Sequence, residues 1–120
     1  MDVLLICGEE DVREVFRAGL RLHHFRVKAE ARGRRQARGL LRAGARGVTI
    51  LDTELADGER GDVLAKAQEY RSRLPVVLVS PRYGKEFEEK AKRLGASAIR
   101  PRPFEIPELL AAIEEATGGE

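Results

Sequence analysis

Five short segments of strand pattern alternate with five segments of helical pattern, and this alternation constrains the fold more than any other feature of the sequence. The strand segments span residues 2–7, 25–30, 48–52, 75–80 and 96–100, and the helical segments span residues 9–24, 33–45, 61–73, 85–95 and 107–119. Residues 25–30 alternate apolar and polar side chains, which predicts a strand with one solvated face. Short strands that alternate with helices are typical of a parallel sheet with helices on both faces. Because crossovers between parallel strands are right-handed, we predict an α/β fold with a doubly wound five-stranded parallel sheet and five helices.

The length and composition indicate one globular domain. The chain has 120 residues, the usual size of a single domain, and we predict one domain over residues 1–117 and a short tail over 118–120. The single cysteine, Cys7, excludes a disulfide within the chain and, with no recognisable export signal, favours a cytoplasmic protein. No apolar run approaches the roughly 18 residues of a membrane span, so we expect no membrane partner.

Basic residues are concentrated in one part of the chain. Between Arg21 and Arg46 lie nine basic residues and one acid, Glu30, so this basic band carries a charge of +8 and the rest of the chain −6. Such a distribution is typical of a surface that binds nucleic acid or an acidic partner. A solvated, arginine-rich helix face produces the same pattern, and we favour this second interpretation over a nucleic-acid partner.

Two of the apolar runs end in polar side chains. Asp52 ends the run over residues 48–52, and Ser80 ends the run over residues 75–80. In open parallel sheets, ligands bind outside the carboxyl ends of the strands. We therefore expect Asp52 and Ser80 to lie near one another at a functional crevice.

Four segments resemble the receiver domains of response regulators, in the order and with the spacing of that family. They are "TILDTELADGERG" (49–61), "LPVVLVSP" (74–81), "LGASAIRPRPF" (94–104) and "PFEIPELLAAI" (103–113). The resemblance extends from Val3 to about Ala116 and implies a flavodoxin-like receiver fold with strand order 2-1-3-4-5. It also implies phosphorelay signalling, in which a sensor histidine kinase passes a phosphoryl group to an aspartate of the receiver.

The resemblance assigns roles to three residues at the carboxyl edge of the predicted sheet. Asp52 stands at the phosphoacceptor position, and Ser80 stands at the position of the switch hydroxyl. Arg102 replaces the lysine that contacts the phosphoryl group in this family. The guanidinium of Arg102 could pair with Asp52 and mimic part of the phosphorylated state, or it could block the site, and the sequence leaves both alternatives open.

The metal site of the family is altered in this sequence. Cys7 and Gly8 stand at the two positions of the metal-binding acids, and Glu9 falls one residue late. The remaining ligands would be Asp52, the backbone carbonyl of Glu54 and, if the loop differs by one residue, Glu9. Because a thiol is a poor ligand for Mg²⁺, we expect weak or absent Mg²⁺ binding.

These observations predict a stand-alone, non-enzymatic receiver-like domain with impaired Mg²⁺-dependent phosphorylation at Asp52. The expected partner is a sensor histidine kinase or another signalling protein, with a homodimer through the face formed by the helix over 85–95, the strand over 96–100 and the helix over 107–119. Ile99 replaces the aromatic residue of that face and would fix it rather than gate it.

Three alternative functions stay open from the sequence. The first is an ordinary phosphate-accepting receiver that uses Glu9 for Mg²⁺. The second is a binder of nucleic acid or an acidic partner through the basic band Arg21–Arg46. The third is a small flavin-binding protein, although the sequence lacks a tryptophan for stacking and a phosphate-binding loop rich in Ser and Thr.

Overall fold

The computed structural model describes residues 2–42, 47–52, 75–80, 84–93, 95–101 and 105–118. The strands are β1 (Asp2–Ile6), β2 (Arg26–Ala31), β3 (Val48–Asp52), β4 (Val76–Ser80) and β5 (Ala98–Pro101). The helices are α1 (Glu10–Leu22), α2 (Arg34–Arg42), α4 (Lys85–Arg93) and α5 (Ile106–Ala116). The predicted helix over residues 61–73 lies outside the described residues.

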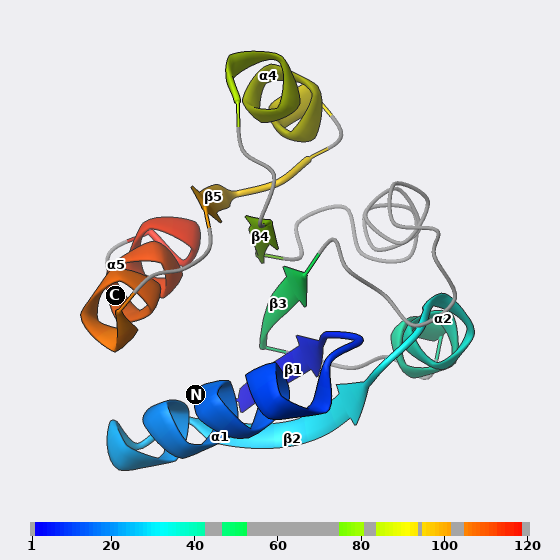
Figure 1. Ribbon diagram of the computed structural model, residues 1–120, viewed down its shortest axis with the longest axis vertical. Helices are drawn as coiled ribbons and strands as arrows, with labels where there is room; N and C mark the ends of the chain where they lie inside the picture. The colour runs from blue at the N-terminus through cyan, green and yellow to red at the C-terminus, as the bar shows by residue number, and fades with distance from the viewer. Residues whose placement is uncertain are drawn as a thin grey trace.

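All five strands form one parallel sheet in the order β2-β1-β3-β4-β5 (Figure 1). This is the predicted order, and the prediction of a doubly wound parallel sheet is confirmed. The three central strands, β1, β3 and β4, consist almost entirely of buried residues because helices cover both of their faces. The order reverses between β1 and β3, which places a switch point at the carboxyl ends of these two strands.

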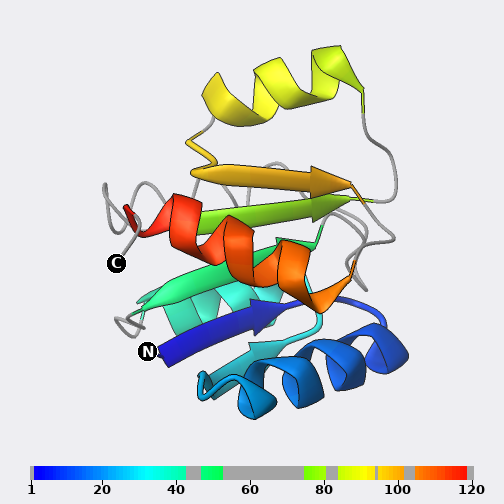
Figure 2. The ribbon, with the colours of Figure 1, turned by 90° about the vertical axis from the view of Figure 1, so that its left-hand side faces the viewer.

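Two hydrophobic clusters fill the space between the sheet and its helices. Helices α1 and α5 cover one face of the sheet, and helices α2 and α4 cover the other (Figures 1 and 2). Alternate residues of β1 belong to opposite clusters, since Val3 and Leu5 face α1 and α5 while Leu4 and Ile6 face α2 and α4. Because all strand pairs are parallel, the carboxyl ends of the strands lie at one edge of the sheet.

Strand β2 departs from the alternation that the sequence predicts. Its register against β1 shifts by one residue between Val3 and Leu4. As a result, Val27 packs against the cluster on the α1 side and Ala29 against the cluster on the α2 side. The expectation of a strand with one solvated face is therefore only partly right, because a bulge exchanges the two faces midway along the strand.

Two glycines allow close approaches within the fold. Gly47 precedes β3 with a φ of +94°, and a Cβ atom there would lie 2.1 Å from the backbone oxygen of Asp2. Gly19 lies inside α1, where a Cβ atom would lie 2.5 Å from Cδ1 of Ile106 at the start of α5. Gly47 needs the small residue for contact distance and for its backbone conformation, whereas at Gly19 the nearest atoms belong to the flexible side chain of Ile106.

None of the helices that the structure describes combines the length and the apolar character that a membrane span requires.

Candidate functional site

The carboxyl edge of the sheet brings Asp52 and Ser80 onto neighbouring strands, as the sequence predicts. Asp52 ends β3 opposite Val79 of β4, and Ser80 ends β4 opposite Pro101 of β5. Asp52 is 0% exposed and Ser80 is 1% exposed. Burying a carboxylate costs free energy unless polar groups surround it. A buried Asp52 therefore indicates a polar site at this edge rather than ordinary core packing.

The side chain of Cys7 contacts the Asp52 carboxylate. Cys7 directly follows β1 and is fully buried, and its Sγ lies 3.7 Å from Oδ2 of Asp52. The same sulfur lies 3.7 Å from the backbone oxygen of Glu9. The thiol is therefore a weak hydrogen-bond donor next to the Asp52 carboxylate.

The residues that the structure describes beside Asp52 offer a magnesium ion a thiol rather than a second carboxylate. Mg²⁺ takes hard oxygen ligands in a near-octahedral arrangement, and a thiol is not one of them. Within the part of the chain that the structure describes, no three His, Cys, Asp or Glu side chains form a group that could hold a metal ion. Glu9 is exposed and is the N-cap residue of α1, while Glu54 and Arg102 lie outside the described residues.

An ion cluster next to Cys7 was not predicted from the sequence. Arg13 of α1 is 9% exposed, and its Nη1 donates a 3.0 Å hydrogen bond to the backbone oxygen of Cys7. Its Nε lies 3.5 Å from Oε1 of Glu30 in β2. Arg17, one turn further along α1, donates from Nε and Nη2 to both oxygens of Glu30 at 2.6 and 2.8 Å.

The pairing of Arg17 with Glu30 shifts the pKa of both side chains. Hydrogen bonds from Arg17 lower the pKa of Glu30 below its ordinary value, although partial burial of the carboxyl opposes this effect. The same hydrogen bonds raise the pKa of Arg17. Two features of the sequence could have indicated this pairing. Glu30 is the one acid within the basic band, and Arg13 and Arg17 stand four residues apart, on one face of α1.

The described part of the basic band extends from the end of α1 through β2 to α2. Arg21, Arg26, Lys28 and Arg32 are exposed. Arg26 and Lys28 each approach a carboxylate oxygen of Asp2, at 4.0 and 3.8 Å. Because β2 is the edge strand of the sheet, basic side chains there also discourage edge-to-edge pairing with another sheet.

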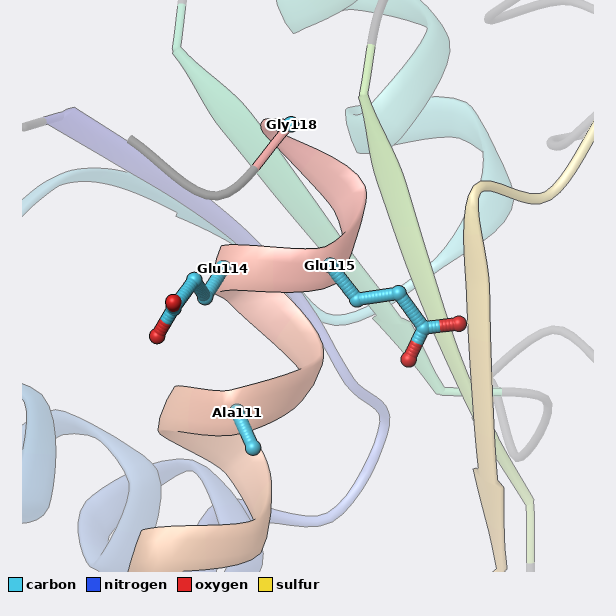
Figure 3. Close-up of a pocket in the computed structure, with 4 residues that line it drawn as sticks. All are labelled: Ala111, Glu114, Glu115 and Gly118. Carbon is cyan, nitrogen blue, oxygen red and sulfur yellow. The ribbon is translucent and has the colours of Figure 1, made fainter.

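An ion pair joins β5 to α5, and a pocket lies at the end of α5. Nη2 of Arg100 in β5 lies 2.6 Å from Oε2 of Glu115 in α5. Ile99 is buried against the cluster on the α4 side. A pocket of about 440 Å³ lies near the C-terminal end of α5, and Figure 3 shows the residues that line it, Ala111, Glu114, Glu115 and Gly118.

This pocket and Asp52 lie at opposite edges of the sheet. The strands point toward one edge, and the C-terminal end of α5 lies at the other (Figure 2). The pocket therefore belongs to a surface separate from the edge at which Asp52 lies.

Comparison with known proteins identifies the fold. No family model matches this sequence, and no curated protein does either. The structure is similar to a LuxR-family two-component response regulator from Aurantimonas sp. SI85-9A1, with a TM-score of 0.86, 24% identity, and coverage of 99% of this chain and 86% of that one. It is also similar to a response regulator receiver protein from Sinorhizobium medicae WSM419, with a TM-score of 0.82, 22% identity, and coverage of 100% and 97%.

A third similar structure comes from the CheX–CheY–BeF₃–Mg²⁺ complex of Borrelia burgdorferi. It has a TM-score of 0.92 and 13% identity, and the match covers 98% of this chain and 89% of that one. The chain therefore has the fold of response-regulator receiver domains, which confirms the resemblance at the level of the fold.

Proposed function

We propose that this chain is a receiver-type signalling domain that acts through contacts with other proteins, with Asp52 at the phosphoacceptor position. The buried Asp52 at the carboxyl end of β3, with Ser80 at the end of the neighbouring strand, supports this function most strongly. The receiver fold and its strand order agree with it. Receiver domains are typically signalling domains without an enzymatic activity of their own, and we propose the same here.

Phosphorylation of Asp52 is impaired in this proposal. A carboxylate that attacks a phosphoryl group approaches another anion, and each close pair of unit charges costs on the order of 4 kcal/mol at an effective dielectric constant of about 20. Phosphoryl transfer therefore depends mostly on positioning and charge neutralisation. The Cys7 thiol beside Asp52 brings no positive charge and is a poor ligand for the cation that would bring it.

Mass spectrometry after incubation with acetyl phosphate and Mg²⁺ tests this proposal, with Asp52→Asn as the control. We expect no phosphate adduct in either protein, or a trace that does not depend on Mg²⁺. A Mg²⁺-dependent adduct that disappears in Asp52→Asn would refute impaired phosphorylation. It would restore the ordinary receiver function in which Glu9 serves the metal.

The signalling role needs a separate test. We expect the chain to bind at least one sensor histidine kinase of its own organism, with similar affinity for wild type and Asp52→Asn, because the fold and not the phosphoryl group provides the contact surface. Calorimetric titration against the purified kinase dimerisation regions measures this binding. Absence of binding to every kinase would argue against a kinase as the partner.

We propose the face of α4, β5 and α5 as the surface for a second copy of the chain. Ile99 is buried and Arg100 is paired with Glu115, so this face has a fixed shape. Sedimentation over a range of concentrations should show dimers, and Glu115→Arg should shift the equilibrium toward monomers. A wild-type chain that stays monomeric at all concentrations would eliminate the homodimer.

A further inference from the structure

We propose that Arg13 is a positioning residue that holds Cys7 against Asp52, so that the shape of this site does not depend on a bound metal ion. The inference rests on the proposed role of Asp52 as the functional carboxylate. It concerns how the segment after β1 is held in place, which the Asp52 role alone does not explain.

The polar groups of Cys7 are fixed from several sides. Its backbone nitrogen donates to the oxygen of Ala31 at 2.9 Å, and its backbone oxygen accepts from Nη1 of Arg13 at 3.0 Å. Its sulfur contacts Asp52 and the backbone oxygen of Glu9. The bond from Arg13 has a donor that carries a full positive charge and an N–O distance of 3.0 Å, and charged hydrogen bonds are stronger than neutral ones.

Arg13 is itself held in a defined orientation. Its Nε faces Glu30 at 3.5 Å, and its Nη2 faces Glu10 at 3.6 Å. Arg17 holds the Glu30 carboxylate from the other side through two short hydrogen bonds. A buried guanidinium is stable only with such partners, and their arrangement directs its remaining donor toward the oxygen of Cys7.

The chemistry explains why an arginine suits this position. The charge of a guanidinium is permanent, and the planar group can donate to a carbonyl and to two carboxylates at the same time. In a metal-bound site, a cation fixes the loop by coordinating acids that the loop carries. Here the loop carries Cys7 and Gly8 at those positions, and the cation that fixes it is part of α1.

The labelling rate of Cys7 measures this effect directly. Cys7 is the one cysteine of the sequence and is fully buried, so a thiol reagent such as Ellman's reagent reacts only when the segment opens. We expect Arg13→Met to accelerate labelling of the native protein by about tenfold or more, because a charged hydrogen bond to a buried carbonyl is lost. Arg13→Lys should give an intermediate rate, since lysine keeps the charge but not the planar fork.

Arg21→Met is the matched control. Arg21 lies on the same helix and is exposed, so its removal should leave the labelling rate of Cys7 unchanged. Urea denaturation of every variant measures the global free energy of unfolding for comparison. Local opening predicts that Arg13→Met accelerates labelling more than its loss of global stability accounts for.

Two results would overturn the inference. The first is a labelling rate in Arg13→Met and Arg13→Lys that rises only in proportion to the global loss of stability, which would make Arg13 a purely structural residue. The second is a clear slowing of wild-type labelling by millimolar Mg²⁺, which would show that a metal holds the segment. Neither measurement uses a phosphoryl donor, so failure here is distinguishable from failure of the proposed function.

Discussion

Replacing Cys7 by aspartate tests the electrostatic reasoning about the site most directly. The Cys7 sulfur lies 3.7 Å from Oδ2 of Asp52, so the new carboxylate would face the old one at close range. Two unit charges at 4 Å repel by about 4 kcal/mol at an effective dielectric constant of about 20. Alternatively, one carboxyl group could take up a proton, which removes the repulsion but costs about 4 kcal/mol at neutral pH. The free energy of unfolding should therefore fall by no more than about 4 kcal/mol.

Magnesium should reverse much of this loss in the variant and have no effect on the wild type. A second carboxylate beside Asp52 supplies the hard oxygen ligand that the described site lacks. At a free Mg²⁺ concentration about 100-fold above the dissociation constant, binding to the folded state would stabilise the variant by about 2.7 kcal/mol. The midpoint of urea denaturation, measured with and without millimolar Mg²⁺, detects both changes.

Cys7→Ser is the control, because it keeps the size and the neutral donor of the thiol. We expect its stability to be insensitive to Mg²⁺. The reasoning would be wrong if Cys7→Asp were as stable as Cys7→Ser without Mg²⁺, or if Mg²⁺ stabilised the two variants equally.

Three further predictions concern stability, each read from the midpoint of urea denaturation. Gly47→Ala should cost more than about 2 kcal/mol, because φ is +94° and the new Cβ would lie 2.1 Å from the oxygen of Asp2; a near-neutral change would contradict the close approach. Thr49→Val should stabilise the protein by about 1 kcal/mol, because the buried Thr49 hydroxyl has no hydrogen-bond partner among the described residues; a loss of stability would reveal a hidden partner. Hydrogen bonds from Arg17 lower the pKa of Glu30 in the folded state. The Glu30 carboxylate therefore stabilises the folded protein fully above the ordinary pKa of 4.5, and this contribution is lost as the pH falls through the lowered pKa. The advantage of wild type over Glu30→Gln should therefore be full at neutral pH and shrink in acid, and an advantage independent of pH would refute the ion pair.

The sheet and its functional edge could be predicted because local patterns determine them. The runs of β3 and β4 are apolar on both faces, which predicts buried parallel strands, and the point where each run becomes polar marks Asp52 and Ser80. Carboxyl ends of parallel strands share one edge, so the two residues could be placed on neighbouring strands before the structure was known. The bounds of β3 are the predicted ones, and those of the other described elements differ from the prediction by one to a few residues, as helix ends and strand ends usually do.

The side-chain network of the site could not be predicted in the same way. Arg13 and Glu30 meet because α1 packs beside β2, and Cys7 meets Asp52 because β1 pairs with β3 in one particular register. Such contacts depend on tertiary geometry, and the identity of the residues alone does not specify them. The bulge in β2 is another example, because one shifted residue moves Val27 and Ala29 to opposite faces.

The contact between Gly19 and Ile106 has a consequence for synthesis of the chain on the ribosome. Ile106 begins α5, and the apolar face of α5 shares one hydrophobic cluster with Phe16 and Leu20 of α1. Because synthesis proceeds from the N-terminus, α1 is made long before α5, although both helices cover the same side of the sheet. Contacts of such high sequence separation form late, so the nascent chain must leave the α1 side of its sheet incompletely covered until the C-terminal helix emerges.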